Sequence, residues 1–470
     1  MSPSPDAKTR LDVRWLCAGG ALVALSRWLV HPAWPDSTDA LGFVLGMSGA
    51  FDLARFQPQF PGYPLFVWPG RALVSLGLSG VGAATLLSAL ASGCTAAALG
   101  RIADRLAGPR AALGAMALHA VAFGPWWLGS SALSESLGLA LAAASICFSL
   151  DDRSLLAGVC GGLLLGARAS YAPLLIAAAL LSRDRVRLAI AAVLSALAWL
   201  LPFAAQQGAR DLLALGVTHL RGHFDTWGGA VTTRPDLSAR LFAFARGLFF
   251  DGLAPQPMAL AAALLFISAA IVLPAPTRLD HGLVRRALLL LAPYALWVFF
   301  GQNLLEQPRH LLPLAEGLIV VAACVAGPRQ PLLLASCSLA VLAASLPLLL
   351  ERKRTPPAGV QAAEWLLQRP DSARTLIAAG RSARIFRAFA APVQVQEHAA
   401  LSDLTTTLAR MPVYPRAIFV TDEIDLRSGR PELPIPARWH TLPGPTFCRD
   451  PRLDRARPCL TLTQLAWSTP

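Results

Sequence analysis

Two carboxylates follow the first long apolar stretch of the chain. Asp36 and Asp39 lie in the run Trp-Pro-Asp-Ser-Thr-Asp-Ala at 34–40, and in a helix this spacing would put both side chains on one face. Carboxylates at such a place can take a proton from an attacking hydroxyl group or hold a divalent cation. The simpler interpretation is a solvated turn in which Asp36 caps a helix.

The composition indicates the kind of scaffold that positions them. The chain has 470 residues, of which 55% are hydrophobic and only 15% are charged, whereas a soluble protein carries about 25% charged residues. Long apolar runs separated by short Arg-rich loops indicate repeated crossing of a lipid membrane. The net charge of +13 does not predict a nucleic-acid partner, because the arginines are spread between apolar segments.

The apolar runs predict an all-α polytopic transmembrane bundle. About 11 spans are expected, at 11–31, 82–100, 111–128, 132–150, 154–168, 170–182, 187–205, 257–274, 285–301, 310–327 and 331–349. Two of them, 154–168 and 170–182, are too short to cross about 30 Å, so we interpret them as a broken pair packed inside the bundle. We expect no cleavable signal peptide, because no small-residue cleavage site follows the first span.

Several segments are predicted to lie at the membrane interface. Residues 62–80 predict an interfacial or re-entrant helix, and residues 240–254 an interfacial helix with Arg240 and Arg246 on one face. Arg27, near the end of the first span, is expected to reach the interface with its charged end. Trp126 and Trp127 fit an aromatic belt and receive no catalytic role.

The charge of the loops predicts the topology. Loops 101–110, 183–187 and 276–286 are short and basic, as cytoplasmic loops usually are. With an odd number of spans, the N-terminus is then cytoplasmic and the C-terminal part is periplasmic. We expect a multi-pass protein of a bacterial inner (cytoplasmic) membrane.

The tail has the composition of a separate soluble domain. Pro356-Pro357 marks a linker, and helices at 359–367, 381–390 and 400–410 with strands at 375–380, 393–395 and 417–421 predict a small α/β domain. The predicted domains are therefore 1–350, the transmembrane part, and 351–470.

Two of the eight cysteines, Cys448 and Cys459, lie outside the predicted membrane region. They can form a disulfide if the tail is extracytoplasmic. The alternative is two free thiols.

A series of short motifs along the chain resembles the GT-C superfamily of polyprenyl-phosphate-sugar-dependent membrane glycosyltransferases, of the ArnT/PMT-like type. The acidic pair comes first, followed by Pro-Gly-Tyr-Pro at 61–64, Leu-Ser-Glu-Ser-Leu at 133–137, Gly-Ala-Arg-Ala-Ser-Tyr at 166–171 and Glu-Gln-Pro-Arg-His-Leu-Leu-Pro at 306–313. The resemblance covers about residues 11–350. His310 stands where the superfamily often has Tyr, and Ala40 stands where many members have Glu or Tyr.

The resemblance implies an enzyme and roles for its residues. A sugar, a hexose or a pentose, would move with inversion from a polyprenyl-phosphate donor to a lipid, glycan or protein acceptor of the cell envelope. Asp39 would be the catalytic base or a metal-side carboxylate, with Asp36 as its helper. Arg309 would face the donor phosphate, which guanidinium groups bind bidentately, with Arg168 and His310 as secondary candidates. A divalent cation is possible, and no other cofactor is expected.

Other residues of the candidate site keep alternatives open. Arg309 could instead reach lipid headgroups. Glu135 could assist acceptor binding or cap its helix, and Tyr63 is an accessory candidate. Glu306, also accessory, is expected to pair with Arg309. His219, His223 and Asp225 form a weak metal-binding pattern, against which a structured polar loop is the simpler interpretation.

Two other functions compete with the enzyme. A transporter or lipid flippase would be expected to show internal repeats and polar residues at mid-membrane. The sequence shows no such repeat, and its acidic residues gather toward one predicted face, which favours an interfacial enzyme. A non-catalytic assembly partner would keep the fold and lose only the activity.

Overall fold

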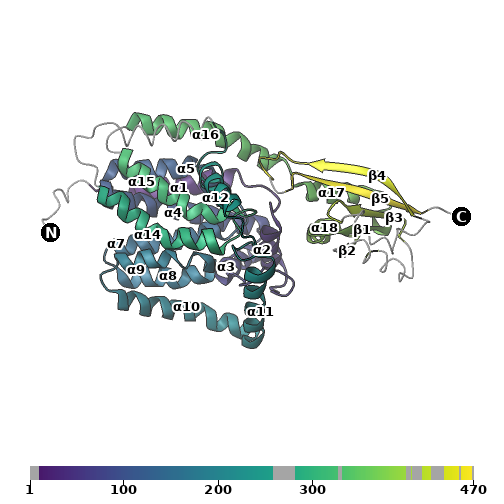
Figure 1. Cartoon of the computed structure of the whole chain (residues 1–470), viewed down its shortest axis with the longest axis horizontal. Coiled ribbons are helices and arrows are strands. Elements are labelled where there is room, and N and C mark those ends of the chain that lie inside the picture. The colour runs from purple at the N-terminus through teal and green to yellow at the C-terminus, as the bar shows by residue number, and fades with distance from the viewer. Residues whose placement is uncertain are drawn as a thin grey trace. The chain divides into compact units, whose positions relative to one another are not determined.

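The computed structural model describes residues 10–257, 281–326, 331–398, 404, 415–424, 439–454 and 457–467. The chain forms two compact units (Figure 1). The first consists of residues 1–35 and 42–350, and the second of residues 36–41 and 351–470.

The first unit is built from helices. The helices α1, α4, α5, α6, α7, α8, α9, α10, α14 and α15 make up most of it, at Val13–Leu29, Gly80–Ala107, Pro109–Val121, Phe123–Gly129, Glu135–Leu150, Ser154–Arg168, Leu174–Leu181, Arg185–Gln207, His281–Gly301 and Leu312–Ala326. Shorter helices, α3, α11 and α12, lie at Pro64–Ser75, Ala209–Arg221 and Leu237–Arg246. Helix α2, Thr38–Ser48, begins in the second unit, and α16, Pro331–Arg354, ends in it.

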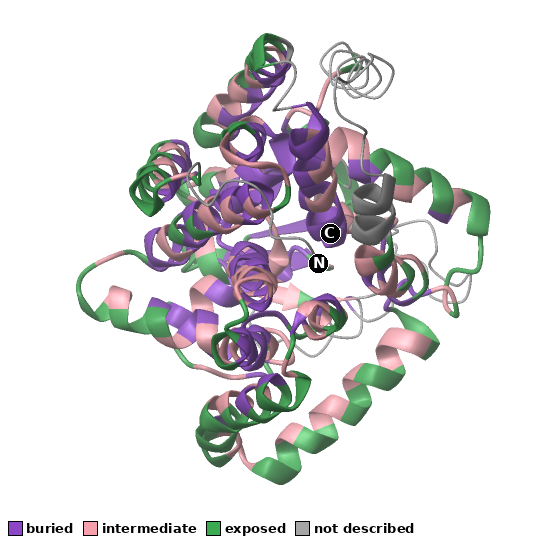
Figure 2. Ribbon diagram, turned by 90° about the vertical axis from the view of Figure 1, so that its left-hand side faces the viewer, coloured by how far each residue is buried: buried purple, intermediate pink, exposed green. Residues whose placement is uncertain are grey.

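The long helices pack side by side through small residues (Figure 1). Neighbouring pairs are α1 with α4, α4 with α7, α7 with α8, and α8 with α10. At Gly162 of α8, an added Cβ atom would lie 2.2 Å from the carbonyl oxygen of Ala192 on α10, so only glycine allows this approach, as is common between membrane helices. The outer helices carry the exposed residues (Figure 2); Val193 and Leu194 of α10 are 58% and 62% exposed, as expected of a surface that faces lipid.

Five helices among the described residues are long and apolar enough to cross a membrane, or six if the bent pair α5 and α6 counts as one span. The two helices of that pair meet at an angle of 65°. The expected number of about 11 spans is therefore not confirmed, although the chain is a mostly helical membrane protein. The predicted span at 257–274 lies outside the described residues but for residue 257.

Two predictions of interfacial side chains, for Arg27 and Trp126, are wrong. Arg27 is fully buried and donates to the carbonyl oxygens of His119 and Ala120 at 2.8 and 2.7 Å. Trp126 is 6% exposed, and its ring lies 4.9 Å from the Arg27 guanidinium. Arg240 is also fully buried. Each cation lies among carbonyl oxygens or an aromatic face inside the protein, which replaces the water it would have found at the interface.

The second unit contains a five-stranded sheet in the order β2-β1-β3-β5-β4. Its strands β1 to β5 lie at Thr375–Ala379, Gln394–Glu397, Ala417–Thr421, Trp439–Cys448 and Cys459–Trp467. β1 pairs in parallel with β2 and β3, whereas β5 pairs antiparallel with β3 and β4. All residues of β1 and β3 are buried, as expected of central parallel strands covered on both faces.

Helices α17, Ala358–Leu367, and α18, Ala383–Phe389, contribute to the core of this unit. Leu366 and Phe386 pack with Ile377 and Phe419 of the central strands. The sequence did not predict β4 and β5, a hairpin whose strands contain prolines and polar residues. The predicted helix at 400–410 lies outside the described residues apart from Leu404.

Candidate functional site

Glu135 holds two arginines inside the first unit. Its Oε1 lies 2.8 Å from Nη2 of Arg168 and 2.9 Å from Nε of Arg309. The Glu135 side chain is fully buried, and the side chains of Arg168 and Arg309 are 4% and 13% exposed. Two guanidinium groups thus meet at one carboxylate, and guanidinium groups are well suited to binding a phosphate anion.

The ends of three helical segments bring these side chains together. Glu135 is the first residue of α7, Arg168 is the last of α8, and Arg309 lies in the short 3-10 helix Pro308–Leu311. Gly138 permits the close approach of α7, because an added Cβ atom there would lie 2.5 Å from Cβ of Arg168. Trp297 of α14 donates to the carbonyl oxygen of Ser170 at 2.9 Å, which fixes the segment after Arg168.

Aromatic side chains surround Arg168. Its guanidinium lies 5.5 Å from the ring of Tyr63 and 5.9 Å from that of Tyr171, a range in which cation–π attraction acts. Tyr294 packs edge-on against Tyr171 with ring centroids 5.6 Å apart, and its hydroxyl donates to the carbonyl oxygen of His310 at 2.7 Å. We name the set Glu135, Arg168, Tyr171, Arg309 and His310 the arginine cluster.

Outside the ion pairs of Glu135, Arg168 and Arg309, two buried polar atoms of the arginine cluster have no hydrogen-bond partner among the described residues. They are the hydroxyl of Tyr171 and Nδ1 of His310, on residues that are 0% and 8% exposed. Leaving such a group unpaired in a protein interior typically costs about 1–3 kcal/mol. A bound ligand with oxygen atoms would provide the partners.

Tyr171 and Tyr294 were not among the residues predicted for the site, although tyrosine is rare in this chain. The chain has only four tyrosines. Tyr171 belongs to the arginine cluster, and Tyr63 and Tyr294 lie next to it.

Glu306 does not pair with Arg309, so that expectation is wrong. Its carboxylate instead lies 2.7 Å from Nη2 of Arg234, with both side chains partly exposed. Asn303 donates to its second oxygen at 3.2 Å. Arg309 is bound to Glu135, which lies on a different helix and which the spacing of the motif could not indicate. Glu135 does not act as a cap for its own helix either, because its carboxylate binds the two arginines.

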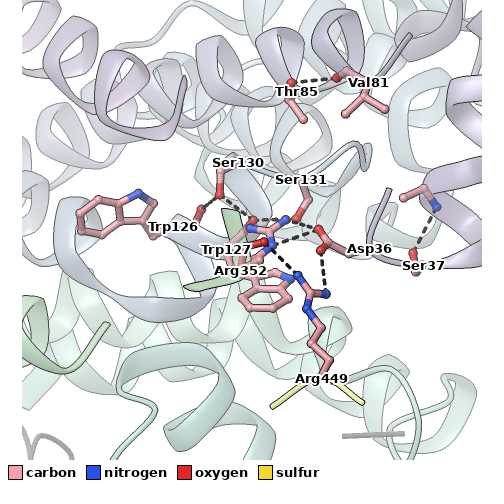
Figure 3. Close-up of polar contacts among 11 residues, drawn as sticks. Asp36, Ser37, Val81, Thr85, Trp126, Trp127, Ser130, Ser131, Arg352 and Arg449 are labelled. Atoms are coloured by element: carbon pink, nitrogen blue, oxygen red, sulfur yellow. Dashed lines mark hydrogen bonds and ion pairs between the residues drawn. The ribbon is translucent and has the colours of Figure 1, made fainter. Parts of the chain in front are cut away.

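The two carboxylates of the acidic pair both belong to the second unit but have different surroundings. Asp36 precedes α2 and lies between two arginines (Figure 3): Nε of Arg352 is 3.0 Å from its Oδ2, and Nη1 of Arg449 is 3.2 Å from its Oδ1. Asp39 lies in the first turn of α2 and is partly exposed. Because Asp36 precedes α2, the two carboxylates do not share a helical face. Ser37, not Asp36, accepts a hydrogen bond from the backbone N–H of Ala40, at 3.1 Å.

The loop with the two histidines forms an aromatic group. The ring of His219 lies 5.0 Å from that of Trp227 and 6.4 Å from that of His223. Burial, and then the neighbouring His223, lower the pKa of His219. Nε2 of His223 lies 2.7 Å from the carbonyl oxygen of Gly301. Within the part of the chain that the structure describes, no three His, Cys, Asp or Glu side chains lie together as metal ligands.

Comparison with solved structures identifies the fold. The crystal structure of ArnT from Cupriavidus metallidurans bound to undecaprenyl phosphate superimposes with a TM-score of 0.55 at 12% sequence identity, covering 87% of this chain and 93% of that one. The chain has the fold of ArnT. The expected resemblance to GT-C glycosyltransferases is confirmed at the level of the fold.

The match to ArnT extends over both units, since 87% of the chain is covered. The crystal structure of ArnT from the same organism in the apo state matches with a TM-score of 0.43 at 15% identity, covering 87% of this chain and 92% of that one. No family model matches the chain. No curated protein sequence matches it significantly.

Proposed function

We propose that this protein is a membrane glycosyltransferase that takes a sugar from a polyprenyl-phosphate-linked donor. The observation that carries the proposal is the arginine cluster: two buried guanidinium groups share one carboxylate, and two buried polar atoms next to them have no described partner. The fold adds support, because the similar ArnT structure is bound to undecaprenyl phosphate. A polyprenyl phosphate presents a phosphate on a lipid chain, which matches a cationic site in a membrane helix bundle.

Each residue of the arginine cluster then has a role toward the donor. Arg168 and Arg309 would donate to the phosphate oxygens, and Glu135 would hold both guanidinium planes in place. The Tyr171 hydroxyl and protonated Nδ1 of His310 would donate to the remaining phosphate oxygens. As the sugar leaves, negative charge grows on the phosphate, and prearranged donors stabilise that charge without reorganising during the reaction.

The reaction balances as a single displacement with inversion. The oxygen of an acceptor hydroxyl forms a bond to the anomeric carbon, and the bond from that carbon to the phosphate oxygen breaks. The electron pair of the broken bond leaves with the polyprenyl phosphate, and the hydroxyl proton passes to a carboxylate. We assign that base to Asp39, a partly exposed carboxylate in the first turn of α2, as the resemblance to the superfamily implies. Tyr63 and Glu306 stay accessory candidates for acceptor binding. The acceptor would be a lipid, glycan or protein of the cell envelope.

We also propose that residues 1–350 form the membrane domain of a bacterial inner-membrane protein and that residues 351–470 form a periplasmic domain. The bond between Cys448 and Cys459 supports this, because disulfides persist in oxidising compartments.

The direct test is transfer by the purified chain in lipid nanodiscs. Radiolabelled hexosyl and pentosyl polyprenyl phosphates are supplied with a fraction of cell-envelope acceptors. We expect the label on an acceptor and release of polyprenyl phosphate in equal amounts. Transport or flipping of the donor without release of polyprenyl phosphate would favour a transporter, and a chain that neither transfers sugar nor binds polyprenyl phosphate would contradict the proposal.

A further inference from the structure

Asp36 is clasped by two arginines that come from distant parts of the chain. Arg352 and Arg449 lie 316 and 413 positions away from it. Their side chains are 0% and 1% exposed, and that of Asp36 is 8% exposed. Nη2 of Arg449 also donates to the carbonyl oxygen of Arg352 at 3.0 Å, which ties the two arginines to each other. We name Asp36, Arg352 and Arg449 the Asp36 clasp (Figure 3).

The arginines of the clasp are firmly supported within the second unit. Arg352 lies in the last turn of α16. Arg449 follows Cys448, which is bonded to Cys459, and its backbone N–H donates to the carbonyl oxygen of Pro458 at 2.7 Å. Burial lowers the pKa of Arg449, and the charge of Asp36 counteracts this in part. The buried carboxylate and the two buried guanidinium groups therefore compensate one another's charges.

The clasp fixes a short segment that also carries Asp39. The compact second unit includes residues 36–41, although the rest of the N-terminal half belongs to the first. Between Asp36 and Asp39 the chain is further constrained by the hydrogen bond from the Ala40 N–H to Ser37. Ala40 and Leu41 are 0% and 1% exposed. The clasp and this hydrogen bond thus restrain the backbone of the segment that carries Asp39.

We propose that Arg352 and Arg449 are positioning residues for the transfer reaction: they hold Asp36 and thereby keep in place the backbone segment that carries Asp39, the base. This inference rests on the proposed function. It replaces the expectation that Asp36 assists the chemistry directly, since both of its oxygens are engaged by guanidinium groups. It also gives Arg352 and Arg449, both of the second unit, a role in the reaction.

The first experiment measures the segment itself and needs no activity. Hydrogen exchange of the backbone amides of residues 37–41 is followed in the full chain and in Arg449→Met and Arg449→Lys variants. The matched control is Arg457→Met, which removes an arginine of the same β4–β5 connection that pairs with Glu423 instead. We expect several-fold faster exchange at 37–41 in Arg449→Met, a smaller change in Arg449→Lys, and none in the control. Unchanged exchange at 37–41 in folded Arg449→Met would overturn the proposal.

The second experiment uses the transfer assay and a double variant. Because small misplacements of a catalytic group can cost about 100-fold, we expect the kcat of Arg449→Met to fall by about 10- to 100-fold. The donor KM should stay within about twofold of the wild-type value, since the interactions with the donor are unchanged. If Arg449 acts through Asp39, the double variant Asp39→Asn with Arg449→Met transfers as slowly as Asp39→Asn alone.

The outcomes separate the two proposals. Losses that multiply in the double variant would mean that Arg449 acts independently of Asp39, and the positioning role would be wrong. If Arg449→Met does not fold, Asp36→Asn replaces it, because it keeps the shape of the clasp and removes its negative charge. A wild-type chain that transfers no sugar contradicts the proposed function alone, since the exchange experiment still decides whether the clasp orders the segment.

Discussion

Glu135 has two partners, and this makes it a residue of the scaffold as well as of the site. Its carboxylate compensates the charges of Arg168 and Arg309, which lie on different segments. Buried charges need partners, so removing Glu135 takes a compensating charge away from both guanidinium groups at once. The same argument makes Glu135 a poor general base, because protonating it would weaken both ion pairs.

We expect Glu135→Gln to lower the free energy of unfolding by about 3–5 kcal/mol, the usual cost of breaking a buried ion pair. The measurement is thermal melting in detergent. The matched control is Glu306→Gln, whose pair with Arg234 is 36% and 46% exposed. An exposed pair contributes at most about 1 kcal/mol. Equal melting temperatures for the two variants would contradict the structural role of Glu135.

A different effect is expected for Asp39→Asn, namely a loss of activity without a loss of stability. Proton removal by a positioned base typically contributes 10²–10⁴ in rate, so kcat should fall by about that factor. Transfer and thermal melting are measured on the same preparation. A folded variant that transfers sugar at close to the wild-type rate would exclude Asp39 as the base.

Arg309→Lys separates donor binding from this chemistry. Lys keeps the positive charge but loses the planar group that binds phosphate oxygens in pairs. We expect the KM for the donor to rise while the KM for the acceptor stays close to its wild-type value. Measuring both constants decides the matter, and a rise in the acceptor KM alone would contradict the assignment.

At this scale the sequence identified most of the charged groups but not their partners. Residue types and the order of the motifs selected Arg168, Arg309 and Glu135 as candidates for the site. The pairing could not be predicted, because it depends on which helix ends meet, and Glu135 and Arg309 lie 174 positions apart in the sequence. For the same reason, nothing in the sequence related Asp36 to Arg449.

At the scale of elements, two arginines of α12, Arg240 and Arg246, have different surroundings. Arg240 is fully buried and donates to the carbonyl oxygens of Phe299, Gly229 and Gln302 at 2.8, 2.7 and 2.8 Å. Two of these oxygens lie near the C-terminal end of α14, where helical carbonyl groups lack partners within the helix. Arg246, six residues later on the same helix, is exposed.

This difference gives a prediction with its control in one helix. Arg240→Met should lower the free energy of unfolding by several kcal/mol, since each buried carbonyl left without a partner costs about 1–3 kcal/mol. Arg246→Met should change it by less than about 1 kcal/mol. Thermal melting of the two variants is the measurement. A larger effect at Arg246 would mean that α12 presents its other face to the protein.

The sequence predicted apolar helices better than the elements between them. Long apolar runs predicted α10 and α15 within about two residues at each end, whereas α4 continues about seven residues beyond its predicted end at residue 100. The hairpin of β4 and β5 has no such pattern: its strands contain Pro443 and Pro445, and the ladder shifts register between Pro443 and Thr446. Its pairing depends on the neighbouring strand β3, which is distant in sequence.

At the scale of the whole molecule, the first unit has arginine ion pairs of its loops at one end and the arginine cluster at the other. Arg101 and Arg105 both pair with Asp151, just after α7, and Arg183 pairs with Asp152. The arginine cluster lies at the other end of the same helix, since Glu135 begins α7 and Leu150 ends it. With 16 residues at about 1.5 Å each, α7 separates the two ends by roughly 24 Å.

The charge of the loops therefore predicts which side of the membrane the arginine cluster faces. Short basic loops remain in the cytoplasm, so the end with Arg101, Arg105 and Arg183 should face the cytoplasm and the arginine cluster should face the periplasm. The loop that contains Asp225 leads back to the cluster side, because Nε2 of nearby His223 lies 2.7 Å from the carbonyl oxygen of Gly301, which precedes Arg309.

We therefore expect reporter fusions after Arg105 and Arg285 to be active only as cytoplasmic reporters, and fusions after Gln57, Asp225 and Gly429 only as periplasmic ones. Gly429 lies outside the described residues, but the bond between Cys448 and Cys459 belongs to the same unit and provides an independent measurement. Mass spectrometry of the chain from membranes, without reductant, should find these two cysteines joined, because the periplasm favours disulfides. A cytoplasmic result at Asp225 would place the arginine cluster on the side away from periplasmic acceptors and would contradict the proposed reaction. A cytoplasmic result at Gly429 together with free thiols would instead require an even number of spans and leave the Asp36 clasp on the wrong side of the membrane for the role proposed here.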